Sequence, residues 1–169
     1  MGQKPVYLGK LRYVNNGIDM STEFETIARQ DEKTADLLCK QGLYNQSMYY
    51  YIQSMEKFIK SYICKKIDIT NDYYANRLRQ LGHSLDAAID FFIEIVSGND
   101  NNLRIQVSDQ LKNGVLKGLR FSTIHNSCRY PSYKNGSYRI TEMTRNDCVQ
   151  LKGMYDMLKT YINSINIRI

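Results

Sequence analysis

The sequence predicts an all-α fold, an up-and-down bundle of about five helices (residues 21–169) after a short N-terminal arm (residues 1–20). Apolar residues recur at intervals of three and four along most of the chain, which is the period of an amphipathic helix. Proline is scarce, with two residues in 169, and there are ten glycines, which favours helices with short connections over a turn-rich β fold. A chain of this length suits one domain.

Helical periodicity is strong in the first 65 residues. A first helix is predicted after the N-cap candidates Ser21 and Thr22, and Gly42 ends it. A second helix is predicted from about Tyr44 to Lys65. It has the most regular spacing of apolar residues in the chain: Met48, Ile52, Met55, Ile59, Tyr62 and Ile63.

The second half of the chain predicts three more helices. The apolar pattern of the third extends from Leu78 to Val96, and that of the fourth follows the NDNN segment and weakens toward Gly118. The segment YPSYKNGSY contains Pro, Asn-Gly and Ser, which predicts no regular structure there. The last helix is expected from Thr141 onward, with Thr141 or Thr144 as its N-cap.

Composition excludes several classes of protein. No run of about 18 apolar residues is present, so we expect no membrane-spanning helix, and the N-terminal residues lack the apolar segment of a secretory signal. The four cysteines form no CxxC motif and have no zinc-finger spacing to a histidine. We therefore expect reduced thiols, no metal, no cofactor and a cytoplasmic location.

Positive charge is concentrated in the C-terminal part of the chain. Residues 1–100 carry 12 Lys/Arg and 13 Asp/Glu, net −1, whereas residues 101–169 carry 11 and 4, net +7. Aromatic residues interleave with these cations, which is typical of a surface that binds a nucleic acid. The alternative is a solvated face beside a subunit interface. The predicted phosphate- or RNA-binding residues are Lys117, Arg129, Tyr130, Lys134 and Arg139.

Four stretches carry a resemblance to a known family. ADLLCKQGLYNQS resembles the end of the family's first helix, and LGHSLDAAI resembles the start of its third, with Ser84 where Asp is common. CRYPSY followed by ITEMTRNDC resembles the loop before its last helix. The second-helix motif (aromatic, Gln, Glu-Lys, Lys) matches Tyr51, Gln53, Glu56, Lys57 and Lys60. Together, over about residues 21–166, they resemble HEPN domains (higher eukaryotes and prokaryotes nucleotide-binding).

The resemblance implies a helical bundle that usually forms a homodimer. Many HEPN proteins are metal-independent endoribonucleases in toxin–antitoxin, phage-defence or CRISPR systems, and their catalytic motif is Arg, four to six residues, then His. Others are non-catalytic modules that bind a nucleotide, RNA or a partner protein. The resemblance therefore implies RNA or a nucleotide as ligand, and an antitoxin or a nucleotidyltransferase as candidate protein partner.

Arg120 and His125 match the catalytic motif, with four residues between them. Histidine titrates in the range that suits a general base for the ribose 2′-hydroxyl or an acid for the leaving oxygen. Arginine binds a phosphate with two hydrogen bonds and stabilises its developing charge. A two-fold dimer would bring two such pairs into one cleft. We therefore predict Arg120 and His125 as catalytic residues of an endoribonuclease.

Three alternatives stay open. Arg77 and His83 also match the motif, with five residues between them, although His83 lies in a Gly-His-Ser turn where the family's histidine is usually structural. The second alternative is a binding module without chemistry, which predicts that Arg120 and His125 lie apart or face the core. The third is a protein-interaction subunit, which predicts an exposed apolar patch beyond the self-dimer interface.

Overall fold

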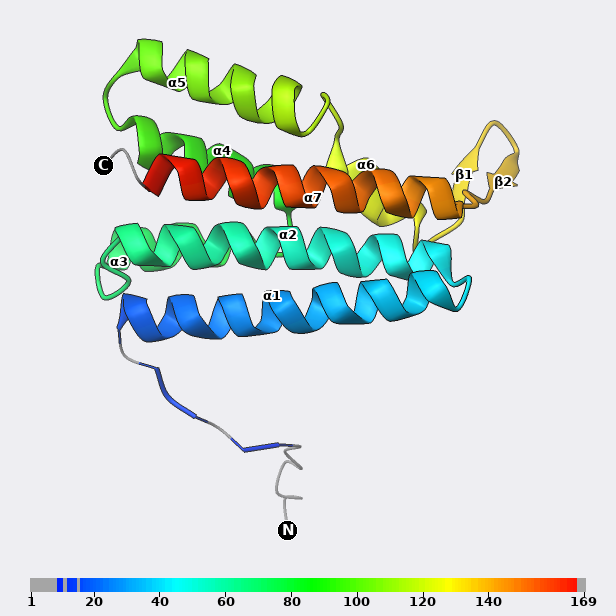
Figure 1. Ribbon diagram of the computed structural model, residues 1–169, viewed down its shortest axis with the longest axis horizontal. Helices are drawn as coiled ribbons and strands as arrows, with labels where there is room; N and C mark the ends of the chain where they lie inside the picture. Colours follow the sequence, from blue (N-terminus) through cyan, green and yellow to red (C-terminus); the bar gives the residue numbers. More distant parts are fainter. Residues whose placement is uncertain (1–8, 11, 15, 167–169) are drawn as a thin grey trace.

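The protein is a helical bundle with one small hairpin at one end (Figure 1). The computed structural model describes residues 9, 10, 12–14 and 16–166, so half of the predicted N-terminal arm lies outside the described residues. The described residues form seven α-helices, one π-helical segment and one two-stranded antiparallel sheet. Among them, no helix combines the length and the apolar character that a membrane crossing requires.

The first two helices pack against each other as an antiparallel pair. Helix α1 spans Gly17–Lys40 and α2 spans Tyr44–Lys66, close to the predicted bounds of the second helix. The predicted N-caps of α1, Ser21 and Thr22, are wrong. The cap is Asn16, whose side chain accepts a hydrogen bond from the Asp19 amide at 2.8 Å. Helix α1 therefore starts inside the stretch predicted as an arm.

The predicted third helix is two helices. Helix α3 spans Asp72–Gln80 and α4 spans Leu85–Ser97. The chain turns between them because Gly82 has a φ of +54°, which ends a helix without the strain that a side chain would add. The Ser84 hydroxyl then accepts a hydrogen bond from the Ala87 amide at 3.1 Å and begins α4.

Five short elements follow α4. Helix α5 spans Asn101–Ser108 and continues into the π-helical segment η1, Asp109–Val115. Helix α6 spans Phe121–Ser127, where the sequence predicted no helix. Strands β1, Ser132–Lys134, and β2, Ser137–Arg139, pair across a two-residue turn.

The prediction of no regular structure over YPSYKNGSY is wrong. Asn135 and Gly136 both have positive φ, +52° and +79°, as a type I′ hairpin turn requires. Helix α7, Arg145–Asn166, closes the bundle, and its first turn confirms Thr144 as the cap. The Thr144 hydroxyl accepts from the Asp147 amide at 3.3 Å, and the Asp147 carboxylate accepts from the Thr144 amide at 2.7 Å.

Helix α2 lies at the centre of the bundle, between α1 and α7, and it also contacts α4 and α6 (Figure 1). Its buried apolar residues form the core with side chains from the neighbouring helices. The largest fully buried side chains come from α2, α4, α6, α7 and the segment around η1: Tyr51, Tyr155, Phe91, Phe92, Phe121, Ile52, Met55, Ile59, Ile63, Leu85, Leu111 and Leu116.

A buried ion pair joins α2 to the turn between α3 and α4. Lys60 and Glu56 pair one helical turn apart, with side-chain exposures of 8% and 2%. The Lys60 ammonium also donates to the carbonyl oxygen of Gly82 at 2.5 Å. Removing one partner of such a pair leaves a buried charge without compensation, which costs far more than losing a surface pair.

We expect Lys60→Ala to lower the free energy of unfolding by about 3–5 kcal/mol, because Glu56 is then buried alone. The control is Arg29→Ala, which removes a pair with Glu25 on the surface, where the arginine side chain is 72% exposed. We expect the control to cost less than about 1 kcal/mol in urea unfolding. Equal costs for the two variants would contradict a structural role for the buried pair.

Candidate nucleic-acid interface

Helix α6 is held in place by a carboxylate from α4. The Asp86 carboxylate accepts hydrogen bonds from the amides of Phe121 at 3.1 Å and Ser122 at 2.8 Å, which are the first two residues of α6. Arg120 occupies the N-cap position but makes no side-chain cap, so Asp86 supplies the missing acceptor. The Phe121 side chain is fully buried and anchors the helix in the core.

His125 lies on α6, half-buried against α2. Its ring centroid is 5.1 Å from that of Tyr49, and its Nε2 atom is 3.2 Å from the side-chain nitrogen of Gln53. Burial, with Arg129 nearby as a further cause, lowers the pKa of His125 below its usual value of 6.5, although a hydrogen bond with the Asn126 side chain opposes this. The imidazole is therefore neutral at pH 7.

Arg120 and His125 border different hollows. Arg120 lines a hollow of about 470 Å³ with side chains from α4 and η1, including Asp90 and Lys112. His125 lines a second hollow of about 280 Å³ with His83 and residues from α2, α4 and α6. Ser122 borders both. The structure thus places Arg120 at the N-cap of α6 and His125 within the helix, with their side chains in separate depressions.

Arg129 follows α6 and stacks on two tyrosines. Its guanidinium carbon is 5.1 Å from the ring centroid of Tyr49 and 4.7 Å from that of Tyr130. The guanidinium also donates to the Tyr130 hydroxyl at 2.6 Å. Both Arg129 and Tyr130 are exposed, so this stack presents a planar cation and an aromatic ring to solvent.

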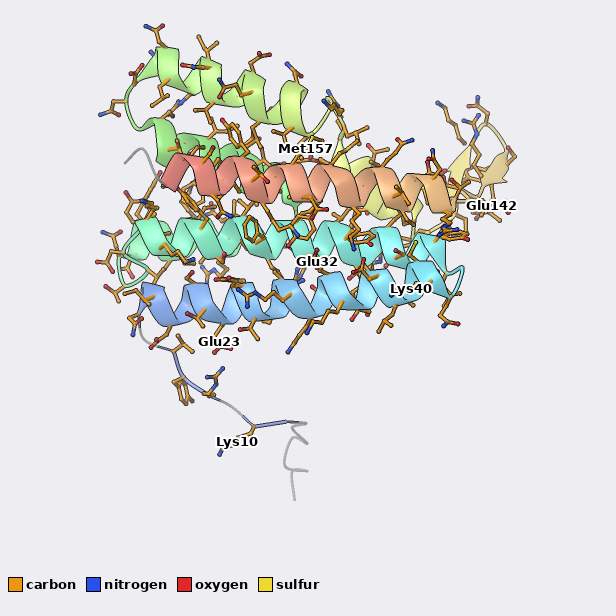
Figure 2. All side chains as sticks on the ribbon, in the orientation of Figure 1. Lys10, Glu23, Glu32, Lys40, Glu142 and Met157 are labelled. Carbon is orange, nitrogen blue, oxygen red and sulfur yellow. The ribbon has the colours of Figure 1, made fainter. Side chains whose placement is uncertain are left out.

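The hairpin adds a second pair of exposed rings. Tyr133 and Tyr138 face each other across the strands, with centroids 5.2 Å apart, and are 67% and 73% exposed. Figure 2 shows nitrogen-tipped side chains that project from the hairpin away from the bundle, and Glu142 near its base. We call the set formed by α6, the hairpin and the start of α7 the basic end: Arg120, Arg129, Tyr130, Tyr133, Lys134, Tyr138, Arg139 and Arg145.

The cations of the basic end lie outside the ion pairs of the described residues. In the described part of the chain, none of Arg120, Arg129, Lys134, Arg139 or Arg145 is in an ion pair, and the same holds for Lys117 in the loop before α6. Four ion pairs join α1 to α2 or α7: Lys57–Asp31, Lys65–Glu25, Lys152–Asp36 and Lys159–Glu32. The basic end therefore keeps its charge available for an external anion.

Two residues that contact His125 or Arg129 have no functional role predicted from the sequence, although Gln53 belongs to the second-helix motif. Tyr49 and Gln53 come from α2, more than seventy positions before the groups that they contact. Gln53 is visible in the sequence as a polar residue within the most regular apolar pattern, and it is 5% exposed in the structure. A buried polar side chain needs a hydrogen-bond partner. A glutamine within an apolar helical pattern therefore predicts such a partner, but the pattern does not say which residue it is.

Comparison with known proteins identifies no relative. No family model matches the chain, and no similar curated protein or solved structure is found. The resemblance to HEPN domains therefore stays a prediction that depends on the quoted motifs. No group of His, Cys, Asp and Glu side chains in the described residues is arranged to hold a metal ion.

We expect Asp86→Ala to lower the free energy of unfolding by about 0.5–2 kcal/mol, because two amides at the start of α6 lose their acceptor. The amides of Phe121 and Ser122 should also exchange hydrogen faster. The control, Asp90→Ala, removes a neighbouring carboxylate that forms an exposed pair with Lys112. If both variants leave these two amides equally protected, Asp86 does not hold α6.

Proposed function

We propose that this protein binds single-stranded RNA through its basic end. The observation that carries the proposal is the set of exposed cations without ion pairs, interleaved with exposed tyrosines on one end of the bundle. Unpaired cations favour a polyanion because binding releases counterions from the phosphate backbone. The order of the HEPN-like motifs along the chain supports the same ligand.

The exposed tyrosines favour a single strand over a duplex. Unpaired bases stack on aromatic side chains, and each stack contributes about 1–3 kcal/mol, whereas the bases of a duplex already stack on each other. The Arg129–Tyr130 stack and the Tyr133–Tyr138 pair offer such platforms beside cations that would contact the backbone. Because these contacts are to backbone and ring faces, the proposed binding depends weakly on base sequence.

We expect the double variant Lys134→Ala/Arg139→Ala to bind single-stranded RNA more weakly and with less dependence on salt. Two lost phosphate contacts should reduce the slope of log K against log salt concentration by about 1.4. Fluorescence anisotropy with a labelled RNA oligonucleotide over several salt concentrations measures the slope. Both side chains are exposed on the hairpin, so the fold should be unaffected.

The matched control is Lys33→Ala/Arg79→Ala, which removes the same charge from exposed positions on α1 and α3. If binding is a general effect of net charge, the two double variants lose affinity equally, and the proposed interface is wrong. A second control uses heparin. If wild type binds heparin with the same slope of log K against log salt concentration, and if replacing Tyr133 and Tyr138 causes no loss of affinity, the surface binds polyanions in general.

A second function, metal-independent RNA cleavage, is favoured by one observation about His125. A neutral, half-buried imidazole lies on α6, and Arg120, which is in no ion pair of the described residues, occupies the N-cap position of the same helix. Neutral imidazole suits a general base for the 2′-hydroxyl, and Arg120 suits the scissile phosphate. Because the two residues border separate hollows in one chain, this function needs a second copy to complete the site.

We expect cleavage of RNA by the purified protein in EDTA, reduced about 10²–10⁴-fold in His125→Ala, as is typical for loss of a general acid or base. The control is His83→Ala, since His83 borders the same hollow and belongs to the alternative motif. Cleavage that survives in His125→Ala but disappears in His83→Ala would assign the chemistry to His83. Inert wild-type protein that still binds RNA leaves binding as the function.

A further inference from the structure

A continuous set of hydrogen bonds connects α1 to the imidazole of His125. The Asp31 carboxylate accepts from the Lys57 ammonium at 2.7 Å. The same ammonium donates to the side-chain oxygen of Gln53 at 3.1 Å. The side-chain nitrogen of Gln53 then lies 3.2 Å from Nε2 of His125. Three helices contribute to this set, because Asp31 is on α1, Gln53 and Lys57 are on α2, and His125 is on α6.

The chemistry of Lys57 fixes the orientation of the Gln53 amide. An ammonium group has only donors, so the atom of Gln53 that faces it must be the carbonyl oxygen. The amide nitrogen, which also has only donors, then faces His125. Rotating the amide by half a turn would set its two hydrogens against the ammonium, so the reverse orientation is disfavoured.

A hydrogen bond between Gln53 and Nε2 of His125 is possible in one protonation state only. The Gln53 nitrogen must donate, so Nε2 must be the unprotonated acceptor and the proton of the neutral ring must be on Nδ1. In an imidazolium, the Nε2 hydrogen would point at the amide hydrogens. Burial keeps water from relieving such a conflict, since Gln53 is 5% exposed and the side chains of Lys57 and Asp31 are 18% and 16% exposed.

We infer that Gln53 is a positioning residue that holds His125 as the neutral tautomer with its proton on Nδ1. This inference extends the second function proposed above but does not require that function, because it concerns the resting state of the ring. Lys57 fixes the orientation of the Gln53 amide, and Asp31 holds the Lys57 ammonium in place. In the second-helix motif, which Gln53, Glu56, Lys57 and Lys60 match, the glutamine therefore has a role distinct from packing.

The hydrogen bond from Gln53 limits how His125 can act as a base. The lone pair that would accept the 2′-hydroxyl proton is already bound by Gln53 in the free chain. His125 can act as a base through Nε2 only when that hydrogen bond is exchanged for one to RNA. Gln53 thus sets the state from which the reaction would begin.

The charged and titratable groups around the ring come from several elements. Arg129, after α6, and His83, in the turn between α3 and α4, oppose protonation of His125, and Glu56, on α2, favours it. Gln53 carries no charge, so replacing it by glutamate changes the one group in contact with Nε2. A carboxylate there accepts a hydrogen bond instead of donating one. The proton of the neutral ring should then move to Nε2, and the pKa of His125 should rise.

The test is two-dimensional ¹H–¹⁵N NMR of the histidine rings in the full-length protein without RNA, as a function of pH. Wild type should show His125 with a protonated Nδ1 and an unprotonated Nε2 near pH 7.5. Gln53→Glu should shift the ring to the Nε2-protonated tautomer and raise its pKa. The matched control is Gln46→Glu, which adds the same charge at an exposed position in the first turn of α2 and should leave His125 as in wild type.

A second variant covers the case in which a buried glutamate prevents folding. Gln53→Met keeps the length of the side chain and removes the donor, so the Nε2-protonated form should become populated. The ring signals of His125 are assigned as those that disappear from the spectrum of His125→Ala. The inference is wrong if wild type carries the proton on Nε2, or if Gln53→Met and Gln53→Glu both leave the tautomer unchanged. No RNA is present, so failure of the proposed cleavage or binding leaves this result unaffected.

Discussion

The position of α2 inside the bundle is the constraint on which the rest of the structure depends. A helix with neighbours on most of its sides buries the polar side chains that it carries, and each of these needs a partner. Several polar side chains of α2 meet that need by bonding to neighbouring elements, whereas Glu56 Oε2 and the Tyr62 hydroxyl have no hydrogen-bond partner in the described residues. Ser47 and Ser54 donate to carbonyl oxygens of α1, Ser54 also accepts from the Tyr155 hydroxyl of α7 at 2.8 Å, and Lys60 donates to the turn before α4. Gln53 reaches α6. The register of α2 therefore determines where its neighbours lie, including the helix that carries Arg120 and His125.

The positively charged side chains fall into two groups, one between the long helices and one at the basic end. Lysines on α2 and α7 pair with carboxylates of α1, which joins the three long helices along their length. The cations of the basic end have no such partners in the described residues. The first group contributes to holding the helices together, and the second is left for a ligand. Both groups contribute to the net charge of +6, which by itself says nothing about this division.

The sequence predicted the long helices well because their apolar residues repeat with the helical period, as in α2 and α7. It missed the break at Gly82 because the apolar pattern continues across it, from Leu78 to Leu85. The hairpin was missed although Asn135-Gly136 is a strong turn signal, because the strands on either side are short and fully exposed and show no alternation. Arg120 and His125 were identified by spacing, but their separate hollows and the contact with Gln53 depend on tertiary packing that no local pattern encodes.

The hairpin contributes almost nothing to the core, since every residue from Ser132 to Arg139 is exposed and the two strands pair only with each other. Substitutions there cost little folding free energy, because a surface position away from packed contacts tolerates change. Selection can therefore alter the charge, length and aromatic content of this segment while the bundle stays intact. Recognition and folding are governed by different residues of the chain, so a relative with the same bundle and another hairpin would be expected to recognise a different ligand.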